Sequence, residues 1–341
     1  MNRTYEIGGY TTTVTVETDG PRRTADALER RTDTLCIYDE TTAGIFAPSG
    51  SRGVVLPAGE SSKRWESVAH TLEEALSREL DRGATFVGVG GGVVTDVAAF
   101  AASVYLRGVR VELVPTTLLA MVDAAFGGKT GINFGGYKNM VGTFHPAAHL
   151  HVHTACLESL SEREFKSGLA EAIKSALLGD VELYEFFSRE RDRVLAREPE
   201  ALRYVVDRSL GVKADVVEQD LREQGRRAIL NLGHTFAHAV EAVVGLGRFS
   251  HGEAVAWGIG RALEVGRRAG MTDEGYARHV TELLLSYGFE MGPLDVDRDQ
   301  ILGAMRYDKK RTAGRLNLVL QEARGRTMVR AVPESAVRDV L

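Results

Sequence analysis

The sequence predicts a protein of two parts, an α/β domain built on a parallel sheet followed by a mainly α-helical domain. Two observations predict it. Short apolar runs alternate with helical patterns up to about residue 155, which is typical of a parallel sheet covered by helices. Beyond Ser161 the pattern changes to long helical segments with few strand-like runs. We therefore expect the α/β domain at residues 1–157 and the helical domain at 158–341.

The individual elements follow from the apolar periodicity, taken in chain order. In the first domain the pattern predicts strands at 34–38, 53–56, 85–89 and 109–114, and helices at 67–80 and 93–105. In the second domain it predicts helices at 162–178, 199–218, 233–244, 253–269 and 273–287, and a small hairpin at 316–320 and 327–332.

Composition narrows the class of protein. A chain of 341 residues with 44% apolar and 26% charged residues is typical of a globular protein with two domains. Its net charge of −5 argues against nucleic acid as a partner, since proteins that bind nucleic acid are usually basic. The two cysteines, Cys36 and Cys156, predict buried thiols rather than a disulfide or a cysteine metal site. With no predicted signal sequence or membrane span, we expect a cytoplasmic protein.

A glycine-rich turn, Gly88 to Gly92, joins the strand at 85–89 to the helix that follows. Glycines let backbone amides approach a phosphate closely, and the helix N-terminus adds partial positive charge. Because the spacing differs from G-x-G-x-x-G, a tight strand–helix turn is the alternative interpretation. Asp96, one turn into the helix, is either a charge near the helix N-terminus or a group that binds a hydroxyl. The turn alone leaves both interpretations open, and the strand–helix alternation around it predicts a nucleotide-binding, Rossmann-like domain.

A second glycine-rich segment carries cations. Glycine, lysine and threonine make up eight of the twelve residues from Gly127 to Lys138. This composition predicts a loop, rather than a regular buried element, that wraps an anionic ligand. Lys129 and Lys138 offer point charges, and Asn139 offers an orienting amide. A solvated turn is the alternative, but the apolar flanks of the segment favour ligand binding.

Histidines and a carboxylate in the second domain indicate a divalent-metal site. His234 and His238 share one face of a predicted helix, and His251 opens the next helical segment. Glu171 lies in an otherwise apolar helix, with Lys174 one turn further on. Imidazoles and carboxylates bind Zn²⁺, and imidazoles four residues apart occur in zinc enzymes. The spacing alone does not decide which three of these four groups bind the metal.

A rival set of histidines lies in the first domain. His149, His151 and His153 alternate along a predicted strand and share one of its faces. We expect them to be exposed at a strand edge with no acid beside them, which would make a weak metal site. The prediction therefore favours the site that contains Glu171.

Longer motifs resemble those of a known family. In chain order they are PAGESSK (57–63), GVGGGVVTD (88–96), YLRG (105–108), VPTTLLAMVD (114–123), GGKTG (127–131), YKNMVG (137–142), SGLAEAIK (167–174), RAILNLGHTFAHAVE (227–241) and HGEAVAWG (251–258). Together they resemble the dehydroquinate synthase family, within the sugar-phosphate cyclases, from Asp39 to Lys310. Because the motifs are long and keep their order, the resemblance is far more specific than any one of them.

The resemblance implies a dehydroquinate synthase-like fold and assigns a metal, Zn²⁺ or Co²⁺, to Glu171, His234 and His251. His238 would face the substrate instead. The implied cofactor is NAD, with contacts from Asp39, Glu60, Lys63, Gly91, Gly92, Asp96, Thr116, Thr117, Ser159 and Leu160. The implied catalytic and substrate-binding residues are His238 with Asp123, Lys129, Lys138, Asn139, Lys174, Lys213, Arg227, Asn231 and one of Lys309 and Lys310.

The reaction implied by the resemblance converts 3-deoxy-D-arabino-heptulosonate 7-phosphate to 3-dehydroquinate and phosphate, in the shikimate pathway of aromatic amino acid biosynthesis. Transient oxidation by NAD, phosphate elimination, re-reduction and an intramolecular aldol closure make up the family's mechanism. A cluster of lysines and Arg227 suits a substrate that carries a carboxylate and a phosphate. The resemblance also implies a homodimer, in which Arg107 reaches the active site of the neighbouring subunit.

The chain departs from the family pattern in one region. Ser161 follows Leu160 where the family has proline, and His151 to Thr154 replace an acidic–threonine stretch. These departures lie next to the cofactor contacts expected at Ser159 and Leu160.

Two alternative functions share most of these features. Other sugar-phosphate cyclases act on the amino analogue of the dehydroquinate precursor or on sedoheptulose 7-phosphate. Lys213, Arg227, Asn231 and His238 follow the dehydroquinate pattern, which disfavours sedoheptulose 7-phosphate and leaves the amino analogue open. A glycerol-dehydrogenase-like, metal-dependent alcohol dehydrogenase would have the same two domains, but it would not need the lysines at 129, 138 and 174.

Overall fold

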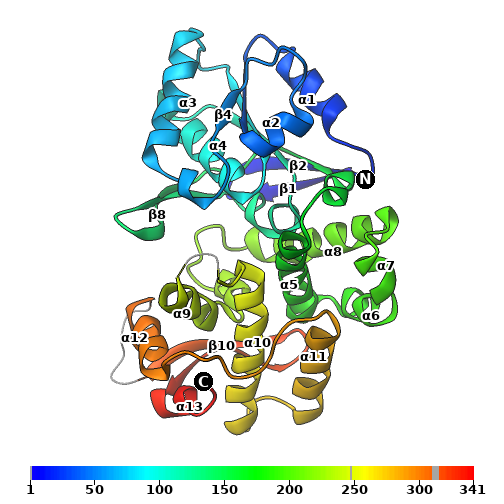
Figure 1. The fold of residues 1–341 in the computed structure, drawn as a ribbon, viewed down its shortest axis with the longest axis vertical. Helices are drawn as coiled ribbons and strands as arrows, with labels where there is room; N and C mark the ends of the chain where they lie inside the picture. Colours follow the sequence, from blue (N-terminus) through cyan, green and yellow to red (C-terminus); the bar gives the residue numbers. More distant parts are fainter. Residues whose placement is uncertain (1, 246–247, 309–314) are drawn as a thin grey trace. The chain divides into compact units, whose positions relative to one another are not determined.

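The chain forms two compact units, and neither unit is a continuous stretch of sequence (Figure 1). The structure is a computed structural model that describes residues 2–245, 248–308 and 315–341. Unit 1 consists of Met1–Leu160 and Arg197–Arg222, and unit 2 consists of Ser161–Ala196 and Glu223–Leu341. The predicted division into domains at 1–157 and 158–341 stays a prediction.

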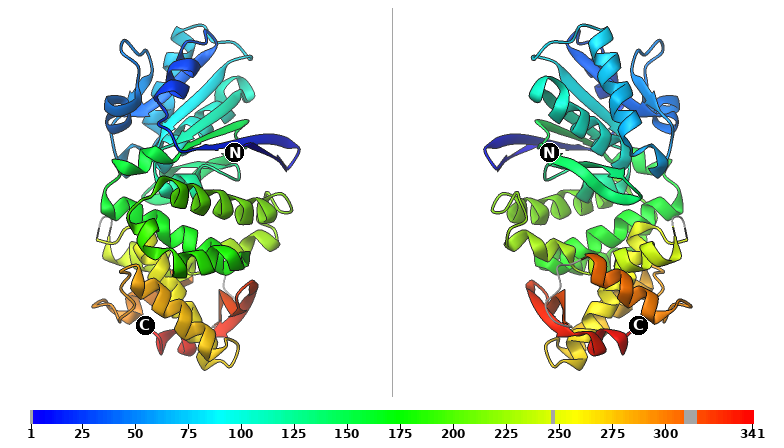
Figure 2. Two further views of the ribbon diagram at one scale, coloured as in Figure 1. Left: turned by 90° about the vertical axis from the view of Figure 1, so that its right-hand side faces the viewer. Right: turned by 90° about the vertical axis from the view of Figure 1, so that its left-hand side faces the viewer.

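Unit 1 is built on a seven-stranded sheet with the strand order β1-β2-β9-β6-β5-β3-β4. Its strands are β1 (Asn2–Ile7), β2 (Tyr10–Glu17), β3 (Thr34–Asp39), β4 (Val54–Leu56), β5 (Thr85–Gly90), β6 (Arg110–Pro115) and β9 (His149–His153). All neighbours pair in parallel except β1, which pairs antiparallel with β2. The β1–β2 hairpin extends beyond the rest of the sheet (dark blue in Figure 2).

Helices accompany this sheet, as strand–helix alternation predicts. They are α1 (Arg22–Glu29), α2 (Glu40–Phe46), α3 (Trp65–Ser77), α4 (Gly92–Val104) and α8 (Pro199–Val217), with short turns η1 (Glu60–Ser62), η2 (Tyr105–Arg107), η3 (Ala120–Ala124) and η4 (Thr154–Glu158). The alanine-rich α4 packs closely against β5. A Cβ at Gly90 would lie 2.6 Å from the Cβ of Val94, so the close approach of helix and strand requires glycine at this position.

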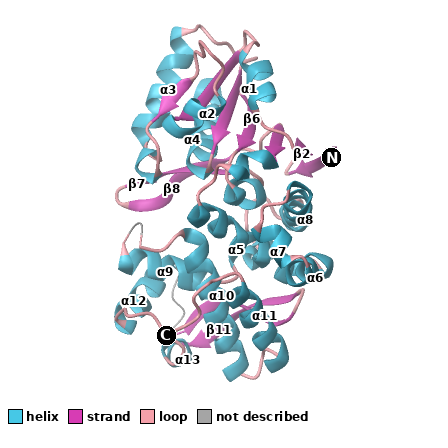
Figure 3. Ribbon diagram, turned by 45° about the vertical axis from the view of Figure 1, so that its right-hand side comes forward, coloured by secondary structure: helices cyan, strands magenta, loops and turns pink. Residues whose placement is uncertain are grey.

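Unit 2 is mainly helical (Figure 3). It contains α5 (Glu162–Gly179), α6 (Val181–Arg189), α7 (Arg191–Leu195), α9 (His234–Val244), α10 (His251–Arg268), α11 (Glu274–Ser286), α12 (Arg298–Asp308), α13 (Glu334–Arg338), the turn η5 (Arg226–Asn231), and a hairpin of β10 (Arg315–Ala323) and β11 (Arg326–Pro333). From Ser167 to Leu178 every residue of α5 is buried, so this helix lies in the core of the unit. Among the described helices, none combines the length and the apolar character needed to span a membrane.

The predicted strands and helices are confirmed to within a few residues at each end, and Cys36 and Cys156 are buried free thiols as predicted. Among the described elements, periodicity missed the β1–β2 hairpin and six helices, α1, α2, α6, α7, α12 and α13.

The prediction of a loop at 127–138 was wrong. The segment instead begins a hairpin of β7 (Lys129–Phe134) and β8 (Tyr137–Phe144), turning at Gly135 and Gly136, which both have positive φ. Most of β8 is exposed, so cross-strand hydrogen bonds and the turn stabilise these strands without an alternating apolar pattern.

Candidate metal and cofactor sites

Three side chains from three helices of unit 2 meet at one point. Glu171 lies in the buried middle of α5, whereas His234 and His251 are the first residues of α9 and α10. The Nε2 atoms of His234 and His251 each lie 3.5 Å from Oε1 of Glu171. Each residue offers a ligand atom within 4.8 Å of the other two, and the set does not include His238.

The local sequence fixes where these helices start. Gly233, with φ of 81°, precedes α9, and a Cβ there would lie 2.8 Å from the Val255 carbonyl oxygen of α10. Ser250 and Glu253 form a capping box that begins α10 at His251. These backbone contacts fix the positions of the two histidines independently of any bound ligand.

The start of α10 is also held against α5. The Gly252 amide donates to Oγ of Ser167 at 3.0 Å, and any Cβ at Gly252 would overlap the backbone of Ser167. Glu171 lies one turn further along the same helix, so this close approach brings His251 to the carboxylate. Gly252, directly after His251, is therefore required for His251 to reach Glu171.

The outer nitrogen of each imidazole has an oxygen neighbour. His234 Nδ1 lies 3.2 Å from the Leu232 carbonyl oxygen, and His251 Nδ1 lies 3.6 Å from Oε2 of Glu241. An Nδ1–H directed at an oxygen leaves the Nε2 lone pair directed toward Glu171. Two imidazoles and a carboxylate are a donor set that Zn²⁺ and Co²⁺ accept, and donor atoms 3.5 Å apart fit a tetrahedral ion with bonds of about 2 Å. The residues fit a divalent metal.

The pKa values of the two histidines in the cluster shift in opposite directions. Burial and the neighbouring Lys174 lower the pKa of His234 to about 3, so its imidazole is neutral near pH 7, the form that binds metals. Burial also lowers the pKa of His251, but hydrogen bonds with Glu171 and Glu241 outweigh it and raise the pKa to about 9. The two carboxylates therefore stabilise positive charge at this position.

Other predicted residues of unit 2 lie near the cluster or in the adjoining η5 turn. Lys174, which is 3% exposed, forms an ion pair with Glu171. The ring centroid of His238 lies 5.5 Å from that of His234, and its side chain is exposed. Arg227 in η5 is buried, and the Asn231 amide donates to Glu223. Lys309 and Lys310 lie outside the described residues.

The predicted cofactor residues of unit 1 gather at the carboxyl ends of neighbouring strands. Asp39 ends β3, Gly91 and Gly92 follow β5, and Thr116 and Thr117 follow β6. Ligands of open α/β sheets bind at this edge. No described side chain caps the N-terminus of α4, so the amides of its first turn are available to a phosphate.

Two of these assignments involve residues that also stabilise the local fold. Asp39 accepts a hydrogen bond from the Thr42 amide at 2.8 Å and so caps α2. Ser159 and Leu160 follow η4, and Nη1 of Arg197 donates to the Leu160 carbonyl oxygen at 2.6 Å. Whether Asp39, Ser159 and Leu160 also contact a cofactor stays a prediction.

An ion pair lies beside the glycine turn. Nζ of Lys63 is 2.5 Å from Oδ2 of Asp96, and both side chains are largely buried. Burial raises the pKa of Asp96, although the neighbouring Lys63 opposes that shift. The pair places one charge of each sign within the region predicted to bind the cofactor.

Asn133 is a residue of this region that the sequence did not identify. Its Nδ2 donates to Oε1 of Glu60 at 2.8 Å, and its Oδ1 accepts from the Asn139 amide at 2.9 Å. Its backbone amide also donates to the Lys63 carbonyl oxygen at 2.8 Å. One side chain thereby links a predicted cofactor residue to a predicted substrate residue. The only signal in the sequence is a polar residue between the apolar Ile132 and Phe134.

The predicted substrate residues of unit 1 divide into two groups. Asp123 lies in η3, a single π-helical turn, and Lys213 of α8 donates to its carboxylate. Lys129, Lys138 and Asn139 lie on the β7–β8 hairpin, with exposed side chains. Asn139 has φ of 53°, an unusual conformation for a residue other than glycine.

The prediction for the rival histidines was wrong. β9 lies between β2 and β6, so it is not an edge strand, and His153 is buried. Acids do lie beside these histidines: Oε2 of Glu112 is 3.0 Å from His151 Nε2, and Oδ1 of Asp19 is 2.8 Å from His153 Nδ1. Glu112 comes from β6 and Asp19 follows β2, so strand pairing brings together residues that are far apart in the sequence. The rings of His149 and His151 stack with centroids 3.7 Å apart.

Arginines make the Glu112 cluster a poor metal site, although Glu112, His149 and His151 are close enough to share an ion. Oε1 of Glu112 accepts from Arg31 and Arg110, each at 3.2 Å, and Oε2 lies 3.0 Å from His151 Nε2, so both carboxylate oxygens already have partners. At Glu171, by contrast, Lys174 pairs with Oε2 and Oε1 faces the two histidines. Burial opposes the ionisation of Glu112, but hydrogen bonds from His151 and Arg31 outweigh it and lower the pKa to about 2. Burial and the neighbouring His151 lower the pKa of His149 to about 4.

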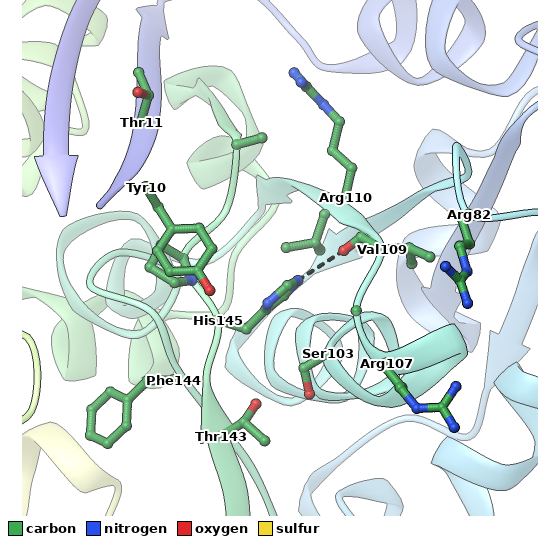
Figure 4. Close-up of a pocket in the computed structure, with 14 residues that line it drawn as sticks. Tyr10, Thr11, Arg82, Ser103, Arg107, Val109, Arg110, Thr143, Phe144 and His145 are labelled. Carbon is green, nitrogen blue, oxygen red and sulfur yellow. Dashed lines mark hydrogen bonds between the residues drawn. The ribbon is translucent and has the colours of Figure 1, made fainter. Parts of the chain in front are cut away.

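A pocket of about 540 Å³ opens on unit 1 beside η2 (Figure 4). Arg82, Arg107 and Arg110 help to line it, and none of the described lining residues is acidic. Leu106 and Arg107 have φ of 47° and 71°, so two consecutive residues other than glycine adopt a strained conformation. Of the predicted site residues that the structure describes, Arg107 alone lines this pocket.

Comparison with known proteins covers both units. The family model described as 3-dehydroquinate synthase N-terminal matches residues 53–167, and the model described as 3-dehydroquinate synthase C-terminal matches residues 168–311. The chain is 43% identical to the 3-dehydroquinate synthase of Acidithiobacillus ferrooxidans over 308 residues, which cover 90% of this chain and 84% of that protein.

Solved structures share the fold over nearly the whole chain. A 2-deoxy-scyllo-inosose synthase complexed with carbaglucose-6-phosphate, NAD⁺ and Co²⁺ has a TM-score of 0.88 at 24% identity, covering 100% of this chain and 99% of that chain. The 2-epi-5-epi-valiolone synthase of Streptomyces hygroscopicus subsp. jinggangensis, with NAD⁺ and Zn²⁺ bound, has a TM-score of 0.85 at 26% identity, covering 97% and 95%. The predicted fold is confirmed.

Proposed function

This chain belongs to the 3-dehydroquinate synthase family, and from that premise we propose that it converts 3-deoxy-D-arabino-heptulosonate 7-phosphate to 3-dehydroquinate and phosphate. The enzyme is then a carbon–oxygen lyase of the shikimate pathway. The observation that supports this best is the cluster of Glu171, His234 and His251 beside the buried Lys174, in a chain that matches this family over both units. The cytoplasmic localisation stays a prediction, which cell fractionation checks.

The chain carries residues for both cofactors of the proposed reaction. Glu171, His234 and His251 would hold Zn²⁺ or Co²⁺. The residues at the carboxyl ends of β3, β5 and β6, with the Lys63–Asp96 pair, would hold NAD. When bound, the metal supplies Lewis acidity toward substrate hydroxyls, and NAD takes and returns a hydride.

The chain's own residues would bind the substrate and move protons. Lys174 and Lys129 would hold fixed positive charge beside substrate oxygens that gain negative charge in the reaction. His238, exposed next to His234, would relay a proton, because an imidazole can both donate and accept one. Arg227 would pair with a substrate anion. Further contacts would come from Asp123, Lys138, Asn139, Lys213 and Asn231.

We also propose a homodimer in which Arg107 reaches the active site of the neighbouring subunit. The Arg107 side chain is exposed and forms no ion pair with any residue that the structure describes. Leu106 and Arg107 both have positive φ, a strained conformation of the kind that clusters at functional sites.

Subunit mixing tests this arrangement. Arg107→Ala and Glu171→Gln should each be inactive alone, whereas a hybrid dimer keeps one complete site. Mixed and reannealed in equal amounts, the two variants should recover about a quarter of wild-type activity. No recovery, together with a monomeric mass by light scattering, would exclude the shared site.

The decisive experiment for the function is incubation of the enzyme with the heptulosonate phosphate, NAD⁺ and Zn²⁺. We expect release of phosphate with no net formation of NADH, because the hydride is returned in each turnover. Phosphate release from sedoheptulose 7-phosphate alone would indicate a different cyclase, and faster turnover of the amino analogue would indicate that substrate. Accumulation of NADH with glycerol would indicate an alcohol dehydrogenase instead.

A further inference from the structure

Glu241 occupies a position that is electrostatically unfavourable for a carboxylate. It occupies the last turn of α9, seven residues after His234, and its side chain is only 12% exposed. The C-terminal end of a helix carries partial negative charge, which disfavours an acid there. Burial adds a desolvation cost, so the carboxylate requires a donor.

His251 is the candidate donor, because it lies within ion-pair distance of Glu241. Its Nδ1 lies 3.6 Å from Oε2 of Glu241. His251 is the first residue of α10. Metal binding at Nε2 requires a neutral imidazole, so the remaining proton is then on Nδ1, the nitrogen that faces Glu241. A neutral imidazole that directs Nδ1–H toward Glu241 has its lone pair on Nε2, which faces Glu171.

The two histidines of the cluster are supported in different ways. The outer nitrogen of His234 faces the Leu232 carbonyl oxygen, part of its own backbone turn. The outer nitrogen of His251 faces a side chain of another helix, and the His251 side chain is more exposed than that of His234, at 29% against 12%. The orientation of His251 therefore depends on a side chain that a substitution can remove.

We propose that Glu241 is a positioning residue for the metal: its carboxylate accepts Nδ1–H of His251 and holds Nε2 toward Glu171 and His234. This inference rests on the metal site proposed above. A carboxylate in this role fixes the ring orientation and increases the basicity of the ligating nitrogen, and its loss weakens metal binding without removing a ligand. Glu241 thereby joins α9 to α10 through the site.

Metal binding tests the proposal without an activity assay. We compare wild type with Glu241→Gln and Glu241→Ala, and use Glu282→Gln as control, because Glu282 is an exposed acid near the C-terminal end of α11. Zn²⁺ affinity is measured by competition with a chelator, the Co²⁺ site by its visible absorption, and the fold by the Tm of the metal-free protein.

We expect Glu241→Ala to weaken Zn²⁺ binding about 100-fold and Glu241→Gln about 10-fold, because glutamine keeps an acceptor but loses the charge. The Co²⁺ spectrum of both variants should change, the metal-free Tm should stay within about 2 °C of wild type, and the control should match wild type throughout. Unchanged affinity and spectrum in the Glu241 variants would overturn the role of Glu241, as would a large fall in the metal-free Tm. Failure of wild type to bind either ion would instead overturn the metal site itself.

Discussion

Nζ of Lys213 lies 2.5 Å from both the carbonyl oxygen and Oδ1 of Asp123, and this joins α8 to η3. The lysine is buried, so the pair is shielded from solvent more than a surface ion pair is. Residues 90 positions apart in sequence thus form one charged element of unit 1.

Breaking this pair should cost both stability and activity. Lys213→Met leaves Asp123 without this donor, and we expect a loss of about 1–3 kcal/mol in the free energy of unfolding. With Asp123→Asn as the second change, a double-mutant cycle by calorimetry should give a coupling of about 1–2 kcal/mol. If the effects of the two changes on the free energy of unfolding are additive, the Lys213–Asp123 contact itself does not stabilise the fold.

The metal ligands can be distinguished from the adjacent histidine. Glu171→Gln should lower metal affinity by more than about 100-fold and abolish turnover, since it removes a buried anionic ligand. His238→Asn, four residues from His234, should keep the metal and lose turnover. Metal content by atomic absorption after dialysis, together with phosphate release, separates the two cases. Full metal content in Glu171→Gln would refute the ligand assignment.

Gly90 at the end of β5 and Gly92 at the start of α4 should respond differently to substitution by alanine. A Cβ at Gly90 would lie 2.6 Å from Val94 Cβ, so Gly90→Ala should destabilise the protein by about 1–3 kcal/mol. A Cβ at Gly92 would lie 3.5 Å from Ala124 Cβ, an ordinary contact, so Gly92→Ala should keep the fold. Because Gly92 is proposed to contact the cofactor, its variant should bind NAD about tenfold more weakly in a fluorescence titration. Wild-type affinity in Gly92→Ala would remove that residue from the cofactor site.

The His149 cluster should make the fold sensitive to acid. The folded-state pKa of His149, about 4, lies below its ordinary value, so the neutral form stabilises the fold above about pH 6.5 and this contribution is lost as the pH falls toward 4. The lowered pKa of Glu112 acts in the same direction, with its stabilisation lost between about pH 4.5 and 2.

Thermal unfolding between pH 7 and 4 checks this dependence. His149→Asn should flatten the fall in stability by about 1–2 kcal/mol, a figure reduced for the partial exposure of the ring. His279→Asn, at an exposed histidine on α11, is the control and should follow wild type. Parallel curves for wild type and His149→Asn would contradict the lowered pKa.

The architecture was predictable because its buried strands and long helices carry strong periodic patterns. The prediction holds for the strand at 85–89, for the glycine turn after it and for the alanine-rich helix that follows. The small residues of this segment let the helix pack closely against the strand. The β7–β8 hairpin was not predictable in this way, because its strands are largely exposed and carry no alternation. Pairing across the hairpin depends on hydrogen bonds that leave no periodic pattern in the sequence.

The candidate metal site was predictable in its members but not in its geometry. Spacing identified Glu171, His234, His238 and His251, and only the family resemblance separated His238 from the rest. The three-dimensional structure adds Glu241 to the residues of this site, because its side chain lies next to His251 although it is at the opposite end of α9 from His234. Glu112 was missed beside His151 for the same reason, because strand pairing joins residues that no local pattern relates.

The exchange of segments between the two units has a consequence for synthesis on the ribosome. The last strand of the main sheet of unit 1 ends at His153, but α8, which packs on β2, η3 and η4, belongs to Arg197–Arg222. A nascent chain therefore finishes this sheet roughly 64 residues before the end of α8, an interval of about 3–13 s at ordinary elongation rates. Until Lys213 and Arg197 are synthesised, Asp123 and the carbonyl oxygen of Leu160 lack these two hydrogen-bond donors. For the first seconds after this sheet is synthesised, β2, η3 and η4 therefore lack their packing partner α8.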